Sequence, residues 1–167
     1  MISFLKKLIC YFRIIEVYEK NNAPNINLSK KYEFKIYRSL KNIKSKKILD
    51  YFKNYKNKKK RFKNKCIFLT LSKNRELVSS GWLYFGKNWT ITEINRNLYN
   101  FNKFIIFDFL TPVKFRNKGF YTKLLKLILS KFKNKTILIY VLITNRKSIR
   151  AITKAGFHFK YRLTKLF

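Results

Sequence analysis

The clearest pattern in the chain is a pair of long apolar runs separated by a helical repeat. Residues 104–110 and 136–143 are apolar at almost every position, which predicts two strands buried on both faces. Between them, apolar residues recur at intervals of three and four, the spacing of a helix with one buried face: Phe120, Leu124, Leu125, Leu127, Ile128 and Phe132. Strand, helix and strand in this order predict a right-handed parallel crossover, with 104–110 at the centre of the sheet.

The rest of the chain shows shorter patterns. Apolar positions over 39–55 recur at roughly helical spacing, which predicts one helix or a broken one. Asn145 is expected to cap a short helix over 147–154, which Gly156 ends. Alternation and turn residues predict strands over 31–38, 66–72, 76–85, 89–94 and 157–163, and loops over 20–28 and 95–103. The sequence therefore predicts a single α/β domain over 1–167 with a mixed sheet, in which the pattern defines 1–30 least.

Composition adds a strong positive charge to this picture. Forty Lys and Arg against seven Asp and Glu give a net charge of +33, which favours nucleic acid, an anionic membrane surface or a polyphosphate ligand as partner. Lys, Asn, Ile, Phe and Tyr are abundant together, as AT-rich coding DNA also produces, so selection and codon drift are both open explanations. A hydrophobic fraction of 47% excludes a disordered chain.

The densest run of basic residues, 54–65, has two interpretations. It contains Tyr55 and Phe62, and basic residues interleaved with aromatic rings are typical of a groove for single-stranded nucleic acid. The alternative is a solvated loop or helix end.

The start of the chain and the cysteines bear on location. Residues 2–18 are apolar but interrupted by basic residues, so they lack the continuous run of roughly 18 apolar residues that a membrane span needs. The charges also fall inside the apolar region, unlike those of a signal peptide. This pattern has two interpretations: residues 2–18 form a basic segment that lies on a membrane surface, or they form a packed helix or strand. Cys10 and Cys66 match no metal or redox spacing, so we expect a reduced, cytoplasmic protein without a metal.

The predicted strand at 104–110 runs into a segment suited to an anion. Thr111 and Pro112 interrupt the apolar run, and a basic turn with one glycine leads into the predicted helix. Amide N–H groups in a first helical turn have no intrahelical acceptor and carry the positive end of the helix dipole. Arg116 and Lys118 add full charges beside them. Phosphate is therefore the expected ligand.

Two motifs in this half of the chain resemble one family. The segment RNKGFYTKLL, residues 116–125, is similar to the acyl-CoA binding loop of the GCN5-related N-acetyltransferases (GNAT), whose pattern is Arg or Gln, two residues, Gly, one residue, then Gly or Ala. The segment NRKSIRAITKAGF, residues 145–157, is similar to the family's later pattern. That second motif is carried by Asn145, Ser148, Lys154, Gly156 and Phe157. The resemblance covers about the last seventy residues.

The resemblance implies a GNAT-like mixed central sheet with splayed strands, flanked by helices, and acetyl-CoA as the acyl-donor cosubstrate. The pantetheine arm would lie in the wedge between the two splayed strands. Contacts to the arm and to the thioester carbonyl are expected from Leu110, Thr111 and Val113. Contacts to the pyrophosphate are expected from Arg116, Asn117, Lys118, Gly119, Phe120 and Tyr121. Asn145 and Ser148 complete the expected donor site.

Two positions depart from the family pattern. Tyr121 stands where the family has a second small residue, so its side chain must point away from the phosphates. Ile152 stands where many members place the tyrosine that protonates the departing thiolate. The candidate replacements are Ser148, Tyr121, Tyr140 and Tyr161, and the reaction can also run without an acid because a thiolate is a good leaving group.

The candidates for the general base come from a small set of ionisable residues. With seven carboxylates in the chain, Asp108 on the central strand and Glu93 on the preceding one are nearest the expected wedge. His158, the only histidine, is a further candidate. Each also has a purely structural interpretation, as a hydrogen-bonded, salt-bridged or solvent-facing side chain.

The residues and the resemblance together predict an acyl-CoA-dependent N-acyltransferase. It would transfer acetyl from acetyl-CoA to a primary amine of a small acceptor, and the charge of +33 favours an anionic acceptor such as a nucleotide-linked amino sugar over a polyamine. The alternative is a catalytically degenerate basic GNAT-like protein that binds nucleic acid through 54–65 or an anionic membrane surface. A third hypothesis is an acyltransferase that uses 2–18 to work at a membrane.

Overall fold

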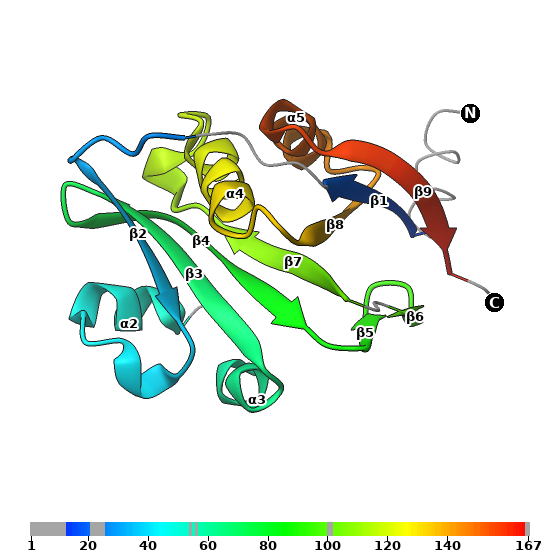
Figure 1. Cartoon of the computed structure of the whole chain (residues 1–167), viewed down its shortest axis with the longest axis horizontal. Coiled ribbons are helices and arrows are strands. Elements are labelled where there is room, and N and C mark those ends of the chain that lie inside the picture. Colours follow the sequence, from blue (N-terminus) through cyan, green and yellow to red (C-terminus); the bar gives the residue numbers. More distant parts are fainter. Residues whose placement is uncertain (1–12, 21–25, 54, 56, 100–101, 166–167) are drawn as a thin grey trace.

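A seven-stranded mixed sheet with helices on both faces forms the core of the protein. The computed structural model describes residues 13–20, 26–53, 55, 57–99 and 102–165. The strand order is β2-β3-β4-β7-β8-β1-β9 (Figure 1). These strands are β1 Ile14–Lys20, β2 Tyr32–Tyr37, β3 Cys66–Lys73, β4 Glu76–Phe85, β7 Lys103–Leu110, β8 Thr136–Leu142 and β9 His158–Thr164. The predicted α/β class with a mixed sheet is confirmed.

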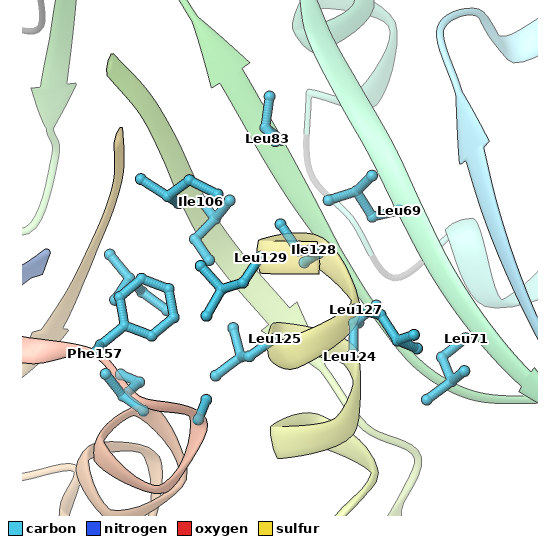
Figure 2. Packing of buried hydrophobic residues seen from close by; sticks show 14 of the residues in the cluster. Leu69, Leu71, Leu83, Ile106, Leu124, Leu125, Leu127, Ile128, Leu129 and Phe157 are labelled. Carbon is cyan, nitrogen blue, oxygen red and sulfur yellow. The ribbon is translucent and has the colours of Figure 1, made fainter. Parts of the chain in front are cut away.

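The helices divide between the two faces of the sheet. One face carries α4 Phe120–Lys131 and α5 Arg146–Ala155, and the other carries α2 Lys46–Phe52 and α3 Lys58–Lys63 (Figure 1). On the first face, leucines of α4 and Ile128 point into a cluster with residues of β3, β4 and β7 (Figure 2). On the second face, Phe52 and Phe62 pack on Trp82 with ring centroids 5.7 and 5.2 Å away. Each buried Leu or Phe side chain contributes about 1.5–3 kcal/mol, so both clusters stabilise the fold.

The strongest sequence patterns are confirmed almost to the residue. The apolar runs form β7, at the centre of the sheet, and β8, its parallel neighbour, and the helical repeat between them forms α4. Residues 39–55 form a short 3-10 turn, Leu40–Asn42, followed by α2, so the predicted helix is broken. The break falls before Ser45, whose Oγ accepts a weak hydrogen bond from the Ile48 N–H at 3.5 Å and so begins a new helix.

Two boundaries predicted before β7 are wrong. The expected strand 89–94 ends early, as β5 Asn88–Ile91, and the expected loop 95–103 contains a strand, β6 Arg96–Tyr99. The two strands pair antiparallel through a turn at 92–95. The apolar pattern missed this hairpin because β6 buries only Leu98, while Tyr99 is exposed and the other two residues are polar. Pairing with β5 stabilises β6, and Thr90 Oγ1 on β5 donates a hydrogen bond to Asn97 Oδ1 on β6 at 2.8 Å.

The chain's first described strand is inserted between two of its last ones. β1 pairs antiparallel with β8 on one side and with β9 on the other. Residues 14–18 of the segment 2–18 are therefore part of a packed strand, whereas 2–12 lie outside the described residues. No helix among the described residues has the length and apolar character needed to cross a membrane.

The parallel pair β7 and β8 separates halfway along its length. Residues 103–106 pair with 136–139, and the pairing between the two strands ends there. Directly beyond the last pair, β7 carries a bulge, because Asp108 and Phe109 stand opposite the single residue Gly81 of β4. Asp108 has a left-handed backbone with φ of 50°. A bulge bends its strand and increases its twist, which accounts for β7 leaving β8 at this point. The splayed strands expected from the resemblance are thus present.

Gly81 is the residue that makes room for this bulge. A Cβ atom at Gly81 would lie 2.4 Å from ring carbons of Phe109, so replacing Gly81 by Ala forces that ring to move. We expect Gly81→Ala to lower the free energy of unfolding by about 1–3 kcal/mol, measured by urea denaturation. In a Phe109→Leu background the same substitution should cost clearly less. An equal cost in both backgrounds would contradict the clash as the cause.

Candidate functional site

A large cleft opens where β7 and β8 separate. Its volume is about 1730 Å³, and its walls come from both faces of the sheet. On the face of α4 and α5 it is lined by the loop before α4 and by one side of α5. On the opposite face it is lined by the α3 segment, the turn between β4 and β5, and the turn between β5 and β6. The cleft therefore passes through the gap between the strands and has one end on each face of the sheet, and we call these two ends its mouths.

The loop before α4 presents backbone N–H groups to the cleft. A 3-10 turn at Val113–Phe115 leads to a segment in which Asn117 and Gly119 both have left-handed backbones, with φ of 61° and 75°. The first intrahelical bond runs from the Lys123 N–H to the Gly119 carbonyl at 2.9 Å, so the N–H groups of residues 120–122 have no intrahelical acceptor. A Cβ atom at Gly119 would meet nothing within 4 Å. A ligand can therefore approach this turn closely, and the helix dipole favours an anion there.

Arg116 braces the same loop. Its Nε donates a hydrogen bond to the Thr111 carbonyl at 3.2 Å, and Thr111 Oγ1 in turn lies 3.2 Å from Ser79 Oγ on β4. The loop is thereby tied to the end of β7 and to the neighbouring strand. The Arg116 side chain is otherwise exposed, which leaves its charge available to an anion at the start of α4.

Most residues predicted for the donor site line the cleft. They are Leu110, Thr111, Arg116, Asn117, Gly119, Phe120, Tyr121, Asn145 and Ser148. Val113, 75% exposed, and Lys118 lie outside the lining. The structure thus brings the two motifs, about thirty residues apart in the chain, to one wall of one cleft.

Tyr121 turns its ring onto the bulge of β7. The Tyr121 ring lies 5.1 Å from that of Phe109, and burial raises the pKa of its phenol above the ordinary value. Tyr121 still contributes to the lining of the cleft. Its ring therefore fills space between α4 and β7 and keeps its proton.

The second motif forms the start and end of α5. Asn145 Oδ1 accepts a hydrogen bond from the Ser148 N–H at 3.2 Å, and Gly156 ends the helix with φ of 100°, as predicted. Ile152 is fully buried in the core cluster that α5 shares with α4. The position of the family's tyrosine is consequently a packing position in this chain, and its side chain does not line the cleft.

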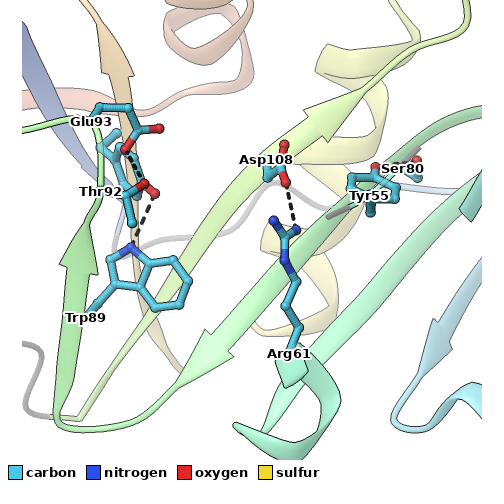
Figure 3. A network of polar contacts seen from close by, with 8 residues as sticks. Tyr55, Arg61, Ser80, Trp89, Thr92, Glu93 and Asp108 are labelled. Atoms are coloured by element: carbon cyan, nitrogen blue, oxygen red, sulfur yellow. Dashed lines mark hydrogen bonds and ion pairs between the residues drawn. The ribbon is translucent and has the colours of Figure 1, made fainter. Parts of the chain in front are cut away.

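On the opposite face, Asp108 is held by an arginine. Arg61 Nη1 of α3 lies 2.7 Å from Asp108 Oδ2, although its N–H does not align with the oxygen well enough for a hydrogen bond (Figure 3). The guanidinium of Arg61 also stands over the rings of Trp82 and Phe107, at 5.1 and 5.3 Å. Arg61, part of the basic run 54–65, thus faces the protein interior, which sequence reasoning did not anticipate.

Tyr140 is the polar side chain on β8 directly after the last residue paired with β7. Trp89 Nε1 lies 3.2 Å from the Tyr140 hydroxyl oxygen. An indole N–H can only donate, so the Tyr140 oxygen accepts and its own proton remains available to a ligand in the cleft. Burial, together with the negative charge of Glu93, raises the pKa of the Tyr140 phenol, which therefore stays protonated. The contact with Trp89 was not predicted, because Trp89 gave no signal beyond that of a strand residue.

Glu93 reaches the cleft from a turn and not from a strand, which corrects its predicted placement. It lies between β5 and β6, where its Oε2 accepts a hydrogen bond from Thr92 Oγ1 at 3.4 Å (Figure 3). Glu93 and Asp108 are the two carboxylate residues in the lining of the cleft. Asp108 is paired with Arg61, whereas Glu93 forms no ion pair with a cation of the described residues.

The other candidates lie elsewhere or are unreactive. His158 and Tyr161 belong to β9 and take no part in the lining. Cys66 does line the cleft, but burial raises the pKa of its thiol to about 11, so it is not a nucleophile near neutral pH. Cys10 lies outside the described residues. Within the described ranges, no three His, Cys, Asp or Glu side chains gather where they could hold a metal ion.

Comparison with known proteins identifies the fold. The sequence matches no family model and no curated protein. The structure is similar to a GNAT-family protein from Novosphingobium aromaticivorans, with a TM-score of 0.62 at 8% identity over 92% of this chain and 62% of that one. It is also similar to a GCN5-related N-acetyltransferase from Sphaerobacter thermophilus (TM-score 0.59, 12% identity, 98% of this chain and 55% of that one). A GNAT-family acetyltransferase from Colwellia psychrerythraea gives a TM-score of 0.56 at 14% identity, over 92% and 55% of the two chains.

The three similar structures share one fold, because each is described as a GNAT-family or GCN5-related protein. The chain has the fold of the GCN5-related N-acetyltransferases. It spans 55–62% of the length of these three structures. The similarity in fold covers 92–98% of this chain, well beyond the two short motifs.

Proposed function

We propose that the protein is an acyl-CoA-dependent N-acyltransferase that moves an acyl group, most simply acetyl, to a primary amine. The observation that carries this proposal is the cleft between the splayed strands, with a helix start whose N–H groups lack intrahelical acceptors at one mouth. A thioester bound there has its phosphates at the loop and its reactive carbonyl in the gap. Transfer then needs little more than positioning and stabilisation of an oxyanion.

The donor site in this proposal combines backbone and charge. The N–H groups at the start of α4, with Arg116 and Gly119, cradle the pyrophosphate of acetyl-CoA. Beyond the last pairing with β8, the backbone of residues 107–110 is free on that side and can bond the pantetheine amides and the thioester oxygen. Asn145 fixes the start of α5 beside the arm, and Ser148 adds a hydroxyl to the same wall.

In this proposal, the residues that handle protons line the cleft on the face opposite the α4 loop. Glu93 takes the proton of the attacking amine, because Asp108 already has the Arg61 guanidinium as its counter-ion. The Tyr140 hydroxyl donates a hydrogen bond to the thiolate that leaves. A thiol pKa of about 8.5 lies well below that of a buried phenol, so Tyr140 keeps its proton and stabilises the charge without transferring it.

The acceptor in this proposal is small and anionic, such as a nucleotide-linked amino sugar. The charge of +33 draws such a molecule to the cleft and repels polyamines. A higher turnover with spermidine than with every anionic amine tested would contradict this part of the proposal.

Binding of the donor is the decisive test. We expect acetyl-CoA to bind the wild-type protein in isothermal calorimetry, and CoA thiol to be released when a suitable amine is added. Absence of acetyl-CoA binding would overturn the proposed function. It would leave the alternative of a catalytically degenerate basic protein, for which tight, steeply salt-dependent binding of RNA or DNA is the expected behaviour.

A further inference from the structure

Four exposed lysines line the end of the cleft that lies away from the α4 loop. They are Lys60 and Lys63 of α3, Lys65 directly after it, and Lys87 in the turn between β4 and β5. We call these four residues the lysine collar. All four line the cleft and are exposed, and none forms an ion pair with a carboxylate in the part of the chain that the structure describes.

The collar and the α4 loop lie on opposite faces of the sheet. α3 packs through Phe62 into the cluster on the side of α2, whereas the loop packs through Phe115 and Phe120 into the cluster on the side of α4. A donor anchored at the loop enters the gap from its own face. The amine must therefore reach the thioester from the other face, and the collar lines the cleft on that side.

The lysine collar differs from the rest of the lysine-rich surface in its position and in its shortage of nearby carboxylates. All four lysines line one concave cleft, whose low-dielectric walls concentrate their potential. The carboxylates that line the cleft are Asp108 and Glu93, and Asp108 is already neutralised by Arg61. The mouth thus holds a surplus of positive charge that a ligand with more than one negative charge would balance.

We propose that the lysine collar binds a phosphate or diphosphate group of the acceptor, so that the substrate is a phosphate-bearing amine. This inference rests on the proposed function, because it assumes that the donor occupies the opposite mouth. The phosphate anchors the acceptor at the collar, while its amine extends past Tyr140 and Glu93 toward the gap. A concave mouth at the end of a cleft favours a small molecule over a polynucleotide, which would follow a longer groove.

The test uses uridine diphosphate (UDP) as a probe on protein saturated with CoA, so that the donor site is already filled. Calorimetry is expected to detect UDP binding that inorganic pyrophosphate displaces. The triple variant Lys63→Gln, Lys65→Gln, Lys87→Gln should weaken UDP binding about tenfold or more. The matched control, Lys131→Gln, Lys133→Gln, Lys135→Gln, removes the same charge outside the cleft and should change UDP binding far less.

Acetyl-CoA binding separates the two proposals. The collar variant should bind acetyl-CoA like the wild type, so a wild type that binds acetyl-CoA but not UDP would overturn the collar alone. Equal UDP binding by the collar and control variants would overturn it as well. A third result would replace the proposal by a nucleic-acid surface: the wild type binds a uridine oligonucleotide more tightly than UDP, and the collar variant loses this binding. A wild type that does not bind acetyl-CoA would overturn the proposed function itself.

Discussion

Replacing Gly119 by Glu is expected to weaken acetyl-CoA binding by about a hundredfold or more. The new carboxylate would stand at the helix start where the pyrophosphate is proposed to bind, and two like charges 4 Å apart at an effective dielectric constant of 20 repel by about 4 kcal/mol before screening. The left-handed backbone at Gly119, φ 75°, adds a cost of roughly 1–2 kcal/mol for a residue with a side chain. A Cβ at this position meets no neighbour, so the fold should survive.

Gly119→Asn is the matched control for this prediction. Asparagine tolerates the left-handed region better than most residues and brings no charge. We expect this variant to lose far less affinity than the Glu variant, and both to show cooperative thermal unfolding. Wild-type affinity in the Glu variant would contradict a phosphate site at the start of α4.

Tyr140→Phe is expected to lower the rate of acyl transfer by roughly 10–100-fold while acetyl-CoA binding stays unchanged. The substitution removes the hydroxyl proton that Trp89 leaves free for a ligand, together with the oxygen that accepts from Trp89. A lost hydrogen bond to a charged group costs about 1.5–3 kcal/mol. The rate is measured as CoA thiol released with the amine that reacts fastest. Because burial raises the Tyr140 pKa above its ordinary value, any fall in rate with pH below about 10 should be the same in the wild type and the Phe variant.

Two further variants distinguish a direct role for Tyr140 from a structural one. Tyr161→Phe changes a half-buried tyrosine of β9 outside the cleft and should leave the rate intact. Trp89→Phe removes the donor that orients Tyr140, so it should lower the rate partly, and adding it to Tyr140→Phe should cause little further loss. Additive effects of the two substitutions would show that Trp89 does not act through Tyr140.

The elements around the donor site could be predicted because their signals are local. The pattern from 104 to 157 alternates buried strands with amphipathic helices, and the cap at Asn145 and the glycine at 156 lie within a few residues of the helix that they bound. The same stretch carries both motifs that resemble the GNAT family. For that reason the predicted order of strand, loop, helix, strand and helix agrees with the structure almost to the residue.

The opposite face could not be predicted in the same way, since its geometry depends on contacts between distant segments. The β5–β6 hairpin has few apolar residues, and its pairing is visible only when the two strands are aligned. Arg61 reads in the sequence as one cation in a basic run. It contacts Asp108 and the rings of Trp82 and Phe107 only because α3 packs close to β7 in the folded protein.

By itself, the sequence determined the α/β class, the central strand β7 and the helix start suited to an anion, because hydrophobic periodicity and backbone caps act over a few neighbouring residues. The tertiary structure alone decided that β1 lies between β8 and β9, that a bulge opposite Gly81 parts β7 from β8, and that Tyr140 keeps a free proton. Strand order, register and hydrogen-bond partners depend on residues far apart in the chain. A local pattern does not specify which distant residue each position contacts.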